Sequence, residues 1–361
     1  MSTRPCAFIT GGAGFIGFHA ARHFLDKRWN VVVLDNLARS GVGVNLNELK
    51  SHSNLTFVRG DVRKPKDIAK ALSCVKGRAD LVIHLAAQVA VTDSVINPRH
   101  DLEVNLLGTF NLLEAVRNFS KTKRPRLFIF TSTNKVYGNL ASVPTIPDAT
   151  RYKLSNANEA IAETQQLDFH SPYGCSKGAA DQYVKDYCSI YGIPTVVLRN
   201  SCIYGSHQYG IEDQGWVAHF GIRAYLNRPI NIYGDGKQVR DILYVEDLIR
   251  LMDILYKNPK VCRGKVYNVG GGKHQALSLL ELAGILESRL KKKISLRFSA
   301  WRPGDQKIYV SDIGQLKNDF GWHPKVSIET GLDRMLSWIE THLDRIEKIS
   351  LGKKPAVSGN G

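Results

Sequence analysis

The chain of 361 residues has few of the features that mark secreted, membrane-spanning or metal-binding proteins. Its six cysteines are scattered without a Cys-x-x-Cys pair, and several lie inside apolar runs, as buried thiols do in a reducing cytosol. We therefore expect no metal site and a cytoplasmic location. No apolar run reaches the roughly 18 residues that a membrane span needs. The segment 1–5 leads straight into an apolar strand, so we expect no signal peptide.

Acidic residues are also in short supply. The chain carries 49 Lys and Arg residues against 33 Asp and Glu residues, which gives a formal net charge of +16. This excess either forms an ordinary solvated basic surface or creates a field that attracts anionic small molecules such as nucleotides. No basic tract is interleaved with aromatic residues, so we expect no nucleic-acid partner. The hydrophobic content of 43% indicates a soluble globular protein with one large core or two lobes.

A glycine-rich turn near the N-terminus carries the first positive signal. Gly11, Gly14 and Gly17 follow a predicted strand and open a predicted helix. Without side chains at these positions, the backbone can approach a pyrophosphate, which the N-terminus of the helix then holds. The next predicted strand ends in Asp35, whose carboxylate can bind a ribose diol and repel a 2′-phosphate. The pattern therefore predicts a dinucleotide site that takes NAD rather than NADP.

Strands and helices alternate as far as about residue 200, which predicts a parallel sheet with helices on both faces. Ala86 and Ala87 follow one of these strands and leave room for a cofactor. Asp61 follows another strand and either accepts from an adenine amine or caps a helix. A single long amphipathic helix is predicted over 98–119. The fold class is therefore α/β, with a Rossmann-type doubly wound parallel sheet.

The stretch 131–177 holds the candidate catalytic residues. Tyr173 and Lys177 follow a proline that can open a helix, and their spacing puts both side chains on one helix face. An ammonium beside a phenol lowers the pKa of the phenol, so we expect Tyr173 to act as a general base toward a hydroxyl proton. Ser132 and Thr133 follow an apolar strand, at the sheet edge where ligand sites lie.

Together these motifs resemble the extended short-chain dehydrogenases/reductases of the nucleotide-sugar epimerase and dehydratase group, from Pro5 to about His342. The resemblance implies a catalytic triad of Thr133, Tyr173 and Lys177, with Ser132 as the alternative to Thr133. Three longer segments are similar to those of the CDP-paratose 2-epimerases, also called CDP-tyvelose 2-epimerases, which serve the synthesis of O-antigen sugars. These segments are 132–138, 166–183 and 213–217.

The motifs and the resemblance imply two sets of binding residues. The residues expected to contact the dinucleotide are Gly11, Gly14, Phe15, Ile16, Gly17, Asp35, Asn36, Asp61, Val62, Leu85, Ala86, Ala87, Gln88, Asn105, Ser132, Tyr173 and Lys177. The residues expected to contact the substrate are Gln88, Thr133, Asn134, Asn200, Gln208, Arg240 and Arg302. Both arginines are predicted to clamp a diphosphate, because a guanidinium binds phosphate bidentately. Their alternative role is a surface ion pair, with Asp241 and Asp305 as the nearest acids in sequence.

The expected organisation follows from these assignments. We predict an NAD-binding Rossmann domain over 1–200, completed by parts of 238–272. A mainly nucleotide-sugar-binding lobe is predicted over 201–345, and a flexible tail over 346–361. The chain has no internal repeat and no Pro/Gly-rich linker, so the smaller lobe is expected to be interwoven with the sheet. We expect a homodimer or homotetramer that forms through the helices near 98–119 and 172–191.

Departures from the group's patterns narrow the expected function. Dehydratases of the group carry acidic residues after the catalytic Thr, where this chain has Asn134 and Lys135, so dehydration is not expected. Cys202 replaces an Asn that usually contacts the substrate, which leaves that contact open. We expect an NAD-dependent epimerase that acts at carbon 2 of a CDP-activated hexose. A UDP-sugar 4-epimerase is the second hypothesis, and a catalytically silent NAD-binding module is the third.

Overall fold

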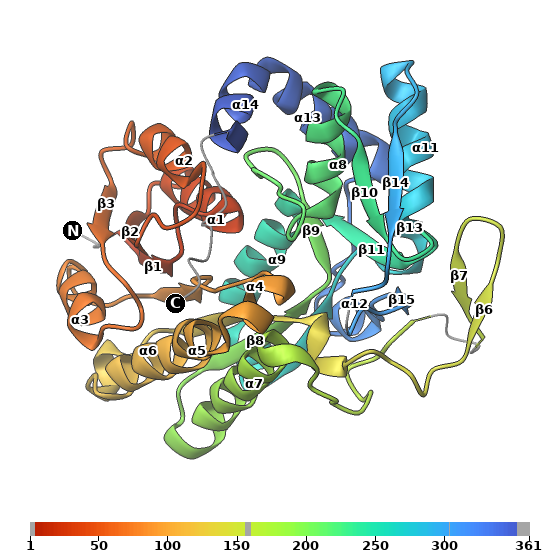
Figure 1. Cartoon of the computed structure of the whole chain (residues 1–361). Coiled ribbons are helices and arrows are strands. Elements are labelled where there is room, and N and C mark those ends of the chain that lie inside the picture. The colour runs from red at the N-terminus through yellow and green to blue at the C-terminus, as the bar shows by residue number, and fades with distance from the viewer. Residues whose placement is uncertain (1–3, 156–159, 303, 352–361) are drawn as a thin grey trace, which may run out of the picture.

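The structure, a computed structural model, describes residues 4–155, 160–302 and 304–351. Its centre is a seven-stranded sheet in the order β12-β8-β5-β4-β1-β2-β3, in which every neighbouring pair is parallel (Figure 1). The strands are β1 (Cys6–Thr10), β2 (Asn30–Asp35), β3 (Leu55–Arg59), β4 (Leu81–His84), β5 (Leu127–Thr133), β8 (Thr195–Asn200) and β12 (Val266–Val269). The inner strands are continuous buried runs, as strands covered on both faces require. The predicted α/β fold class is confirmed.

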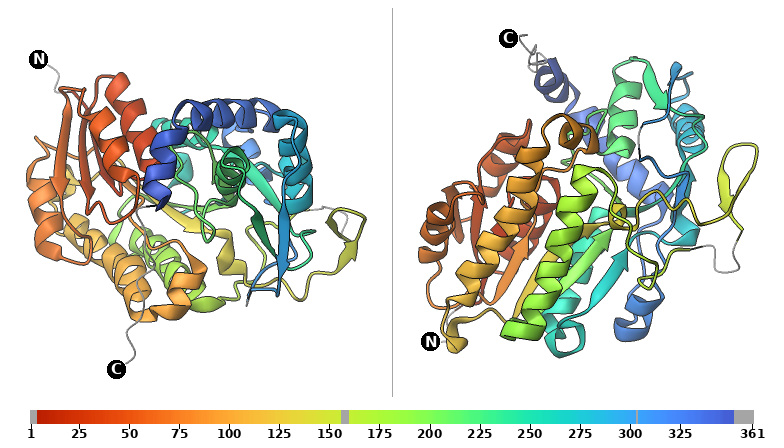
Figure 2. Two further views of the ribbon diagram at one scale, coloured as in Figure 1. Left: turned by 45° about the horizontal axis from the view of Figure 1, so that its top comes forward. Right: turned by 60° about the horizontal axis from the view of Figure 1, so that its bottom comes forward.

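Helices cover both faces of this sheet (Figure 2). One face packs against α1 (Phe15–Asp26), α9 (Val245–Lys257) and α12 (Gly314–Phe320) through a core that includes Phe18, Leu248 and Leu316. The other face packs against α3 (Pro65–Ser73), α6 (Gly108–Arg117) and α7 (Ser171–Tyr191). Because α9, α12 and β12 come from the last third of the chain, the large sheet is completed only after the smaller lobe has begun.

The smaller lobe has its own apolar core, which contains Phe220, Tyr244 and Leu332. Its strands are β9 (Cys202–Tyr204), β10 (Ile230–Tyr233), β11 (Val239–Tyr244), β13 (Ala276–Ser278), β14 (Leu296–Ser299) and β15 (Ile308–Tyr309). Its helices are α8 (Trp216–Tyr225), α11 (Leu279–Leu290), α13 (Ile328–Thr341) and α14 (Leu343–Leu351). β11 pairs with β9, β13 and β15, and β10 pairs with β14.

The remaining elements are short. They are α2 (Val42–Leu49), α4 (Val91–Ile96), α5 (Pro98–Leu102), α10 (Pro259–Cys262), β6 (Thr145–Pro147), β7 (Tyr152–Leu154), the 3-10 turns Lys121–Lys123, Asn134–Tyr137 and Lys273–Gln275, and the π turn Glu103–Leu107. β6 and β7 form a hairpin that projects from the smaller lobe (Figure 1). Within the described ranges, no helix has the length and apolarity needed to cross a membrane.

The helix predicted over 98–119 is continuous over 98–117, but it contains a π turn that was not predicted, where Asn105 exchanges two hydrogen bonds of 3.0 Å with the backbone of Gln88. One sequence expectation about these elements is wrong. The flexible tail predicted over 346–361 begins instead with α14, whose Ile346 is buried in the core of the smaller lobe. The remainder of that tail, 352–361, lies outside the described residues.

Candidate functional site

The turn between β1 and α1 has no room for side chains at its glycines. Gly11 has a φ of +67°, and a Cβ on Gly17 would lie 2.1 Å from the carbonyl oxygen of Gly11. Gly14 is the N-cap of α1 and offers no side-chain cap, so Phe15, Ile16 and Gly17 form a first turn whose N–H groups lack a capping side chain. This arrangement fits the binding of a phosphate group at the N-terminus of a helix.

Asp35 lies at the end of β2 and faces the glycine turn. Its carboxylate accepts from the N–H of Ala13 at 3.0 Å and from the N–H of Leu37 at 2.8 Å. Burial raises the pKa of Asp35, and these two N–H donors oppose that rise. The carboxylate is therefore held in one orientation beside the backbone that is expected to hold the pyrophosphate.

A second carboxylate, that of Asp61, lies beside the loop after Asp35. Asn36 donates to it at 3.2 Å, and Arg63 donates to it at 2.7 and 3.0 Å. Burial by itself would raise the pKa of Asp61, but the donors from Arg63 and Asn36 lower it to about 2. Helix α3 has no side-chain cap, so the alternative of Asp61 as its cap does not hold. The neighbouring Val62 packs in the core and closes over Gly108.

The segment after β4 is held in place by hydrogen bonds to Thr10 and Asn105. Leu85 and Ala86 donate their N–H groups to Thr10 at 3.1 and 3.3 Å, and Gln88 is fixed by its two backbone hydrogen bonds with Asn105. Ala87 lies between these two anchored points. Asn105 is almost fully buried, and its amide group donates to other residues of the protein. The structure therefore supports a role for Asn105 in positioning the predicted cofactor contacts.

The predicted catalytic residues come together at the ends of β5 and α7. Thr133 lies close enough to Tyr173 to lower the pKa of the phenol, and its hydroxyl donates to the Oδ1 atom of Asn134 at 3.3 Å, whereas the hydroxyl of Ser132 is buried without a hydrogen-bond partner in the described part of the chain. This geometry favours Thr133 over Ser132 as the residue that contacts the phenol. The Nζ atom of Lys177 donates to the carbonyl of Thr131 at 2.6 Å and lies 4.1 Å from the ring centroid of Phe130.

The expected lowering of the Tyr173 pKa is not seen. Burial raises the pKa of Tyr173 to about 12, against the hydrogen bond from Thr133; Asp101 adds to the rise, and Arg39 opposes it. Burial also lowers the pKa of Lys177 to about 7, although Asp181 and Asp101 act in the opposite direction. The prediction failed because sequence spacing shows which side chains share a helix face but does not show how deeply both are buried.

The predicted substrate residues lie on several segments of the chain. Asn134 donates to Gln306 at 3.3 Å, and Asn200 lies at the end of β8. Gln208 is buried and donates to the carbonyl of Ile203 at 3.3 Å. Four predicted site residues carry a buried side-chain oxygen with no hydrogen-bond partner in the described ranges, namely Gln88, Ser132, Asn200 and Gln208. Buried polar atoms normally have partners, so this concentration is consistent with a polar ligand.

Both predicted diphosphate clamps form ion pairs; of the two acids named from the sequence, Asp305 takes part, as the partner of Arg240, and Asp241 does not. Arg240 contacts Asp305 at 3.0 Å, and Arg302 contacts Asp213 at 2.8 Å. Asp241 is instead buried and accepts from Ser201 and from the N–H of Gly272. Asp241 does not pair with Arg240, its neighbour in sequence, because alternate residues of β11 point to opposite faces of the sheet.

Several residues that shape the site were not predicted. Asp101 accepts from Ser176, the neighbour of Lys177, and from Asn105 at 3.0 Å. Asp181 forms a buried ion pair with Arg199 at 2.9 Å, which ties α7 to β8. The only available sequence signals were that Asp101 lies one turn before Asn105 and that Asp181 lies one turn after Lys177.

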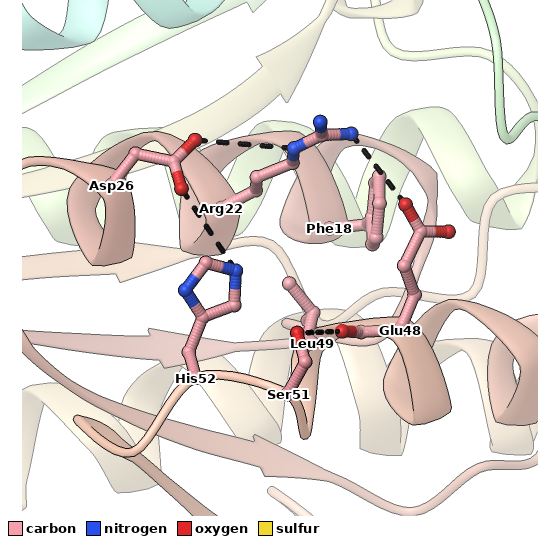
Figure 3. A pocket seen from close by; sticks show the side chains of 7 residues that line it. All are labelled: Phe18, Arg22, Asp26, Glu48, Leu49, Ser51 and His52. Atoms are coloured by element: carbon pink, nitrogen blue, oxygen red, sulfur yellow. Dashed lines mark hydrogen bonds and ion pairs between the residues drawn. The ribbon is translucent and has the colours of Figure 1, made fainter.

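A separate surface pocket of about 200 Å³ lies between α1 and α2 (Figure 3). Its charged side chains are paired with one another, since Arg22 contacts Glu48 at 3.5 Å and Asp26 at 3.9 Å. None of the predicted site residues lines it. Across the described residues, no group of three or more His, Cys, Asp or Glu side chains is arranged to hold a metal ion.

Comparison with known proteins places the chain in a family. The family model for GDP-mannose 4,6 dehydratase matches residues 8–335. The chain belongs to this family of extended short-chain dehydrogenases/reductases. It is 44% identical to the CDP-paratose 2-epimerase of Salmonella typhi, over 91% of this chain and 98% of that protein. It is 30% identical to the dTDP-glucose 4,6-dehydratase of Shigella flexneri, over 95% of each chain.

Solved structures agree with this assignment. The UDP-glucuronic acid 4-epimerase of Bacillus cereus, solved in complex with UDP-glucuronic acid and NAD, is 28% identical with a TM-score of 0.79, over 93% of this chain and 99% of that chain. The family is enzymatic, and these three members act on nucleotide sugars. The predicted family resemblance is confirmed.

Proposed function

We propose that the protein is an NAD-dependent epimerase that inverts carbon 2 of a CDP-activated hexose, with CDP-paratose as the expected substrate class. The observation that carries the proposal is the environment of Thr133. Its hydroxyl reaches Tyr173, while the next two side chains are an amide and an ammonium rather than acids. The similarity to a CDP-paratose 2-epimerase over nearly the whole chain supports the same assignment.

The residues present fit NAD. The glycine turn and the first turn of α1 suit the pyrophosphate, and the carboxylate of Asp35 suits a free ribose diol. The buried hydroxyl of Ser132 and the amide oxygen of Gln88 would find partners in the nicotinamide half. NAD, when bound, supplies an acceptor that takes a hydride from carbon 2 and returns it, and a positive charge that lowers the pKa of Tyr173.

The protein's own residues then have two tasks. Tyr173 takes the proton from the hydroxyl at carbon 2 and later returns it, while Thr133 hydrogen-bonds the same oxygen. Lys177 holds the nicotinamide ribose and orients the phenol from the same helix face. Arg240 and Arg302 hold the diphosphate, so the keto sugar can turn about its bond to the diphosphate and present its other face.

Dehydration needs a different set of side chains at the sugar. Removing water across carbons 5 and 6 requires an acid for the leaving hydroxyl and a base for a carbon-bound proton. Asn134 donates its amide to Gln306 and cannot supply a proton as an acid. Lys135 is ion-paired with Asp305 at 3.5 Å. The two positions therefore support hydroxyl-directed chemistry and not elimination, although the family model bears the name of a dehydratase.

Isotope labelling tests the proposal directly. Substrate deuterated at carbon 2 is expected to give an epimerised product that keeps the label at carbon 2, with no uptake of solvent deuterium there. Mass spectrometry and proton NMR of the product measure both quantities. Loss of the label to water would contradict the proposal and favour a route through deprotonation, for which Lys135 is the nearby base.

A second candidate function is epimerisation of carbon 4 of a UDP-sugar, which the structural similarity to a UDP-glucuronic acid 4-epimerase favours. Incubation with CDP-paratose or CDP-glucose in parallel with UDP-glucose, followed by analysis of the released sugars, separates the two candidates. Absence of turnover on every nucleotide sugar would instead favour a silent NAD-binding module.

The oligomeric state is part of the proposal. Apolar side chains are exposed on α4, on the segment 98–117 and on α7, which lie side by side (Figures 1 and 2). They include Ile96, exposed to 73%, and Ile190, exposed to 66%. Phe110 and Tyr183 pack edge to face between the helices and are also exposed. We propose that a second copy of the chain covers this face, in a homodimer or a homotetramer. Light scattering of the purified protein measures the number of copies.

A cytoplasmic location is also proposed. All six cysteines are free and several are buried, as is usual where thiols stay reduced.

A further inference from the structure

Lys135 connects the candidate catalytic hydroxyl, through its backbone, with a buried group of charges, through its side chain. Its backbone N–H donates to the hydroxyl oxygen of Thr133 at 3.2 Å, so the two residues are held in a fixed relation. Its side chain turns away from Thr133 into the smaller lobe, where Nζ lies 3.5 Å from the Oδ1 atom of Asp305. Only 20% of the Lys135 side chain is exposed. The ammonium therefore lies in the predicted substrate site and not on the outer surface.

The same carboxylate oxygen also serves Arg240. An NH2 group of Arg240 donates to the Oδ1 atom of Asp305 at 3.0 Å, and the N–H of Gln306 donates to it at 3.0 Å. Lys135 comes from the 3-10 turn after β5, Arg240 from β11 and Asp305 from the loop before β15. Three separate segments thus bring two cations to a single anionic oxygen, and the set of three side chains keeps a net positive charge.

Burying a net positive charge costs free energy unless an anion neutralises it. The single carboxylate of Asp305 cannot neutralise both Lys135 and Arg240. Arg240 and Lys135 repel each other, and burial together with Arg240 lowers the pKa of Lys135, against the attraction of Asp305. Arg302, the second predicted clamp, lies three positions before Asp305 and stacks on the ring of Tyr233 at 3.9 Å. A diphosphate bears a negative charge on each phosphate, and so it matches these cations better than one carboxylate does.

We propose that Lys135 binds the diphosphate of the nucleotide sugar together with Arg240, and that Asp305 is the internal counter-ion from which the diphosphate takes both cations. This inference rests on the proposed nucleotide-sugar substrate and adds a residue to its binding site. It also gives Lys135 a function in the reaction. The diphosphate is the fixed point about which the keto sugar turns, and Lys135 ties that point to Thr133 through its own backbone.

Nucleotide binding tests the assignment without any need for turnover. Titration calorimetry with CDP and with UDP is carried out on the NAD-loaded wild type and on Lys135→Met. The substitution should weaken both nucleotides about ten- to a hundredfold, as expected for the loss of a charge-assisted contact. Both nucleotides should lose the same factor because Lys135 is assigned to the phosphates and not to the base. Lys257→Met is the matched control, since it removes an exposed lysine and its ion pair with Asp253 on α9.

Lys135→Arg separates binding from base catalysis. Arginine keeps the charge but does not act as a base, so this variant should keep CDP affinity within about threefold and retain turnover. Unchanged CDP affinity in Lys135→Met, with NAD content and melting temperature like those of the wild type, would overturn the proposal. So would normal CDP binding by Lys135→Arg with turnover lost, because Lys135 would then be the base. Should Lys135→Met fail to fold, Lys135→Gln takes its place with the same expected loss.

The role of Lys135 and the epimerase activity can fail separately. A protein that binds CDP through Lys135 but leaves carbon 2 unchanged refutes the epimerase assignment alone. A protein that inverts carbon 2 with a CDP affinity that does not depend on Lys135 refutes the role of Lys135 alone.

Discussion

Replacing Lys177 by methionine should abolish turnover and still leave the cofactor-free fold at least as stable as that of the wild type at pH 7. Lys177 is 3% exposed, and burial lowers its pKa from 10.5 to about 7. The ammonium is therefore disfavoured in the folded chain relative to the unfolded chain. Methionine removes this cost and fills a similar volume, at the loss of the hydrogen bond to Thr131.

The sign and size of the pH effect follow from proton linkage. Between the folded pKa and the unfolded pKa, the unfolded chain binds one more proton at this site, so wild-type stability from Lys177 rises with pH. With a folded pKa of about 7, the rise between pH 7 and pH 9 is about 2 kcal/mol. Lys177→Met lacks this slope, and the titrating groups that Lys177 does not influence cancel in the difference; Asp101 and His84, whose pKa values Lys177 lowers, are the two exceptions.

Guanidinium unfolding of nucleotide-stripped wild type and Lys177→Met at pH 7, 8 and 9 measures this difference. From pH 7 to pH 9, the free energy of unfolding of the wild type should rise by about 2 kcal/mol more than that of the variant. Lys70→Met, which replaces an exposed lysine on α3, should show no such gain. A difference between wild type and Lys177→Met that stays constant with pH would refute the reasoning, since Lys177 would then be charged in the fold throughout.

Further substitutions test other parts of the site. Tyr173→Phe should reduce turnover by about 10²–10⁴-fold while NAD stays bound, because only the acid/base hydroxyl is lost, and more than a hundredth of activity remaining would exclude Tyr173 as the base. Asp35→Arg should weaken NAD and strengthen NADP, measured by fluorescence titration, and unchanged NAD affinity would show that Asp35 does not reach the ribose. Asp181→Asn should cost about 3–5 kcal/mol in guanidinium unfolding, because it leaves Arg199 charged and buried at 5% exposure, and a loss below about 1 kcal/mol would contradict this.

Local patterns predicted the large sheet well because its determinants are local. Continuous apolar runs, a glycine turn followed by a helix, and Asp35 at the end of β2 are all visible in short windows of sequence. The strand boundaries shifted by only a few residues; β5, for example, continues through Thr133 and carries the candidate catalytic hydroxyl at its last position. The order of the strands, which reverses between β1 and β4, is that of a doubly wound sheet.

What the sequence did not predict depends on contacts between distant segments. The π turn at Asn105 depends on bonds to Gln88, and the ion pair of Arg240 depends on a loop more than sixty positions later. The pKa of Tyr173 depends on burial, which no spacing rule measures. The helix α14 near the C-terminus also depends on a distant contact, because its Ile346 packs against the core of the smaller lobe.

The three residues Thr133, Asn134 and Lys135 show how one backbone can support different reactions. They follow one another in the chain, yet their side chains reach Tyr173, Gln306 and Asp305 respectively. The strand β5 fixes the first of them, and the 3-10 turn that follows sends the next two into the smaller lobe. The hydroxyl of Thr133 also donates to the Oδ1 atom of Asn134 at 3.3 Å, so a change at the second position acts on Thr133 directly, whereas the side chain of the third position contacts Asp305 instead. Relatives that are each about 30% identical to this chain carry names that record dehydration in one case and epimerisation in another, so the fold alone does not fix the reaction.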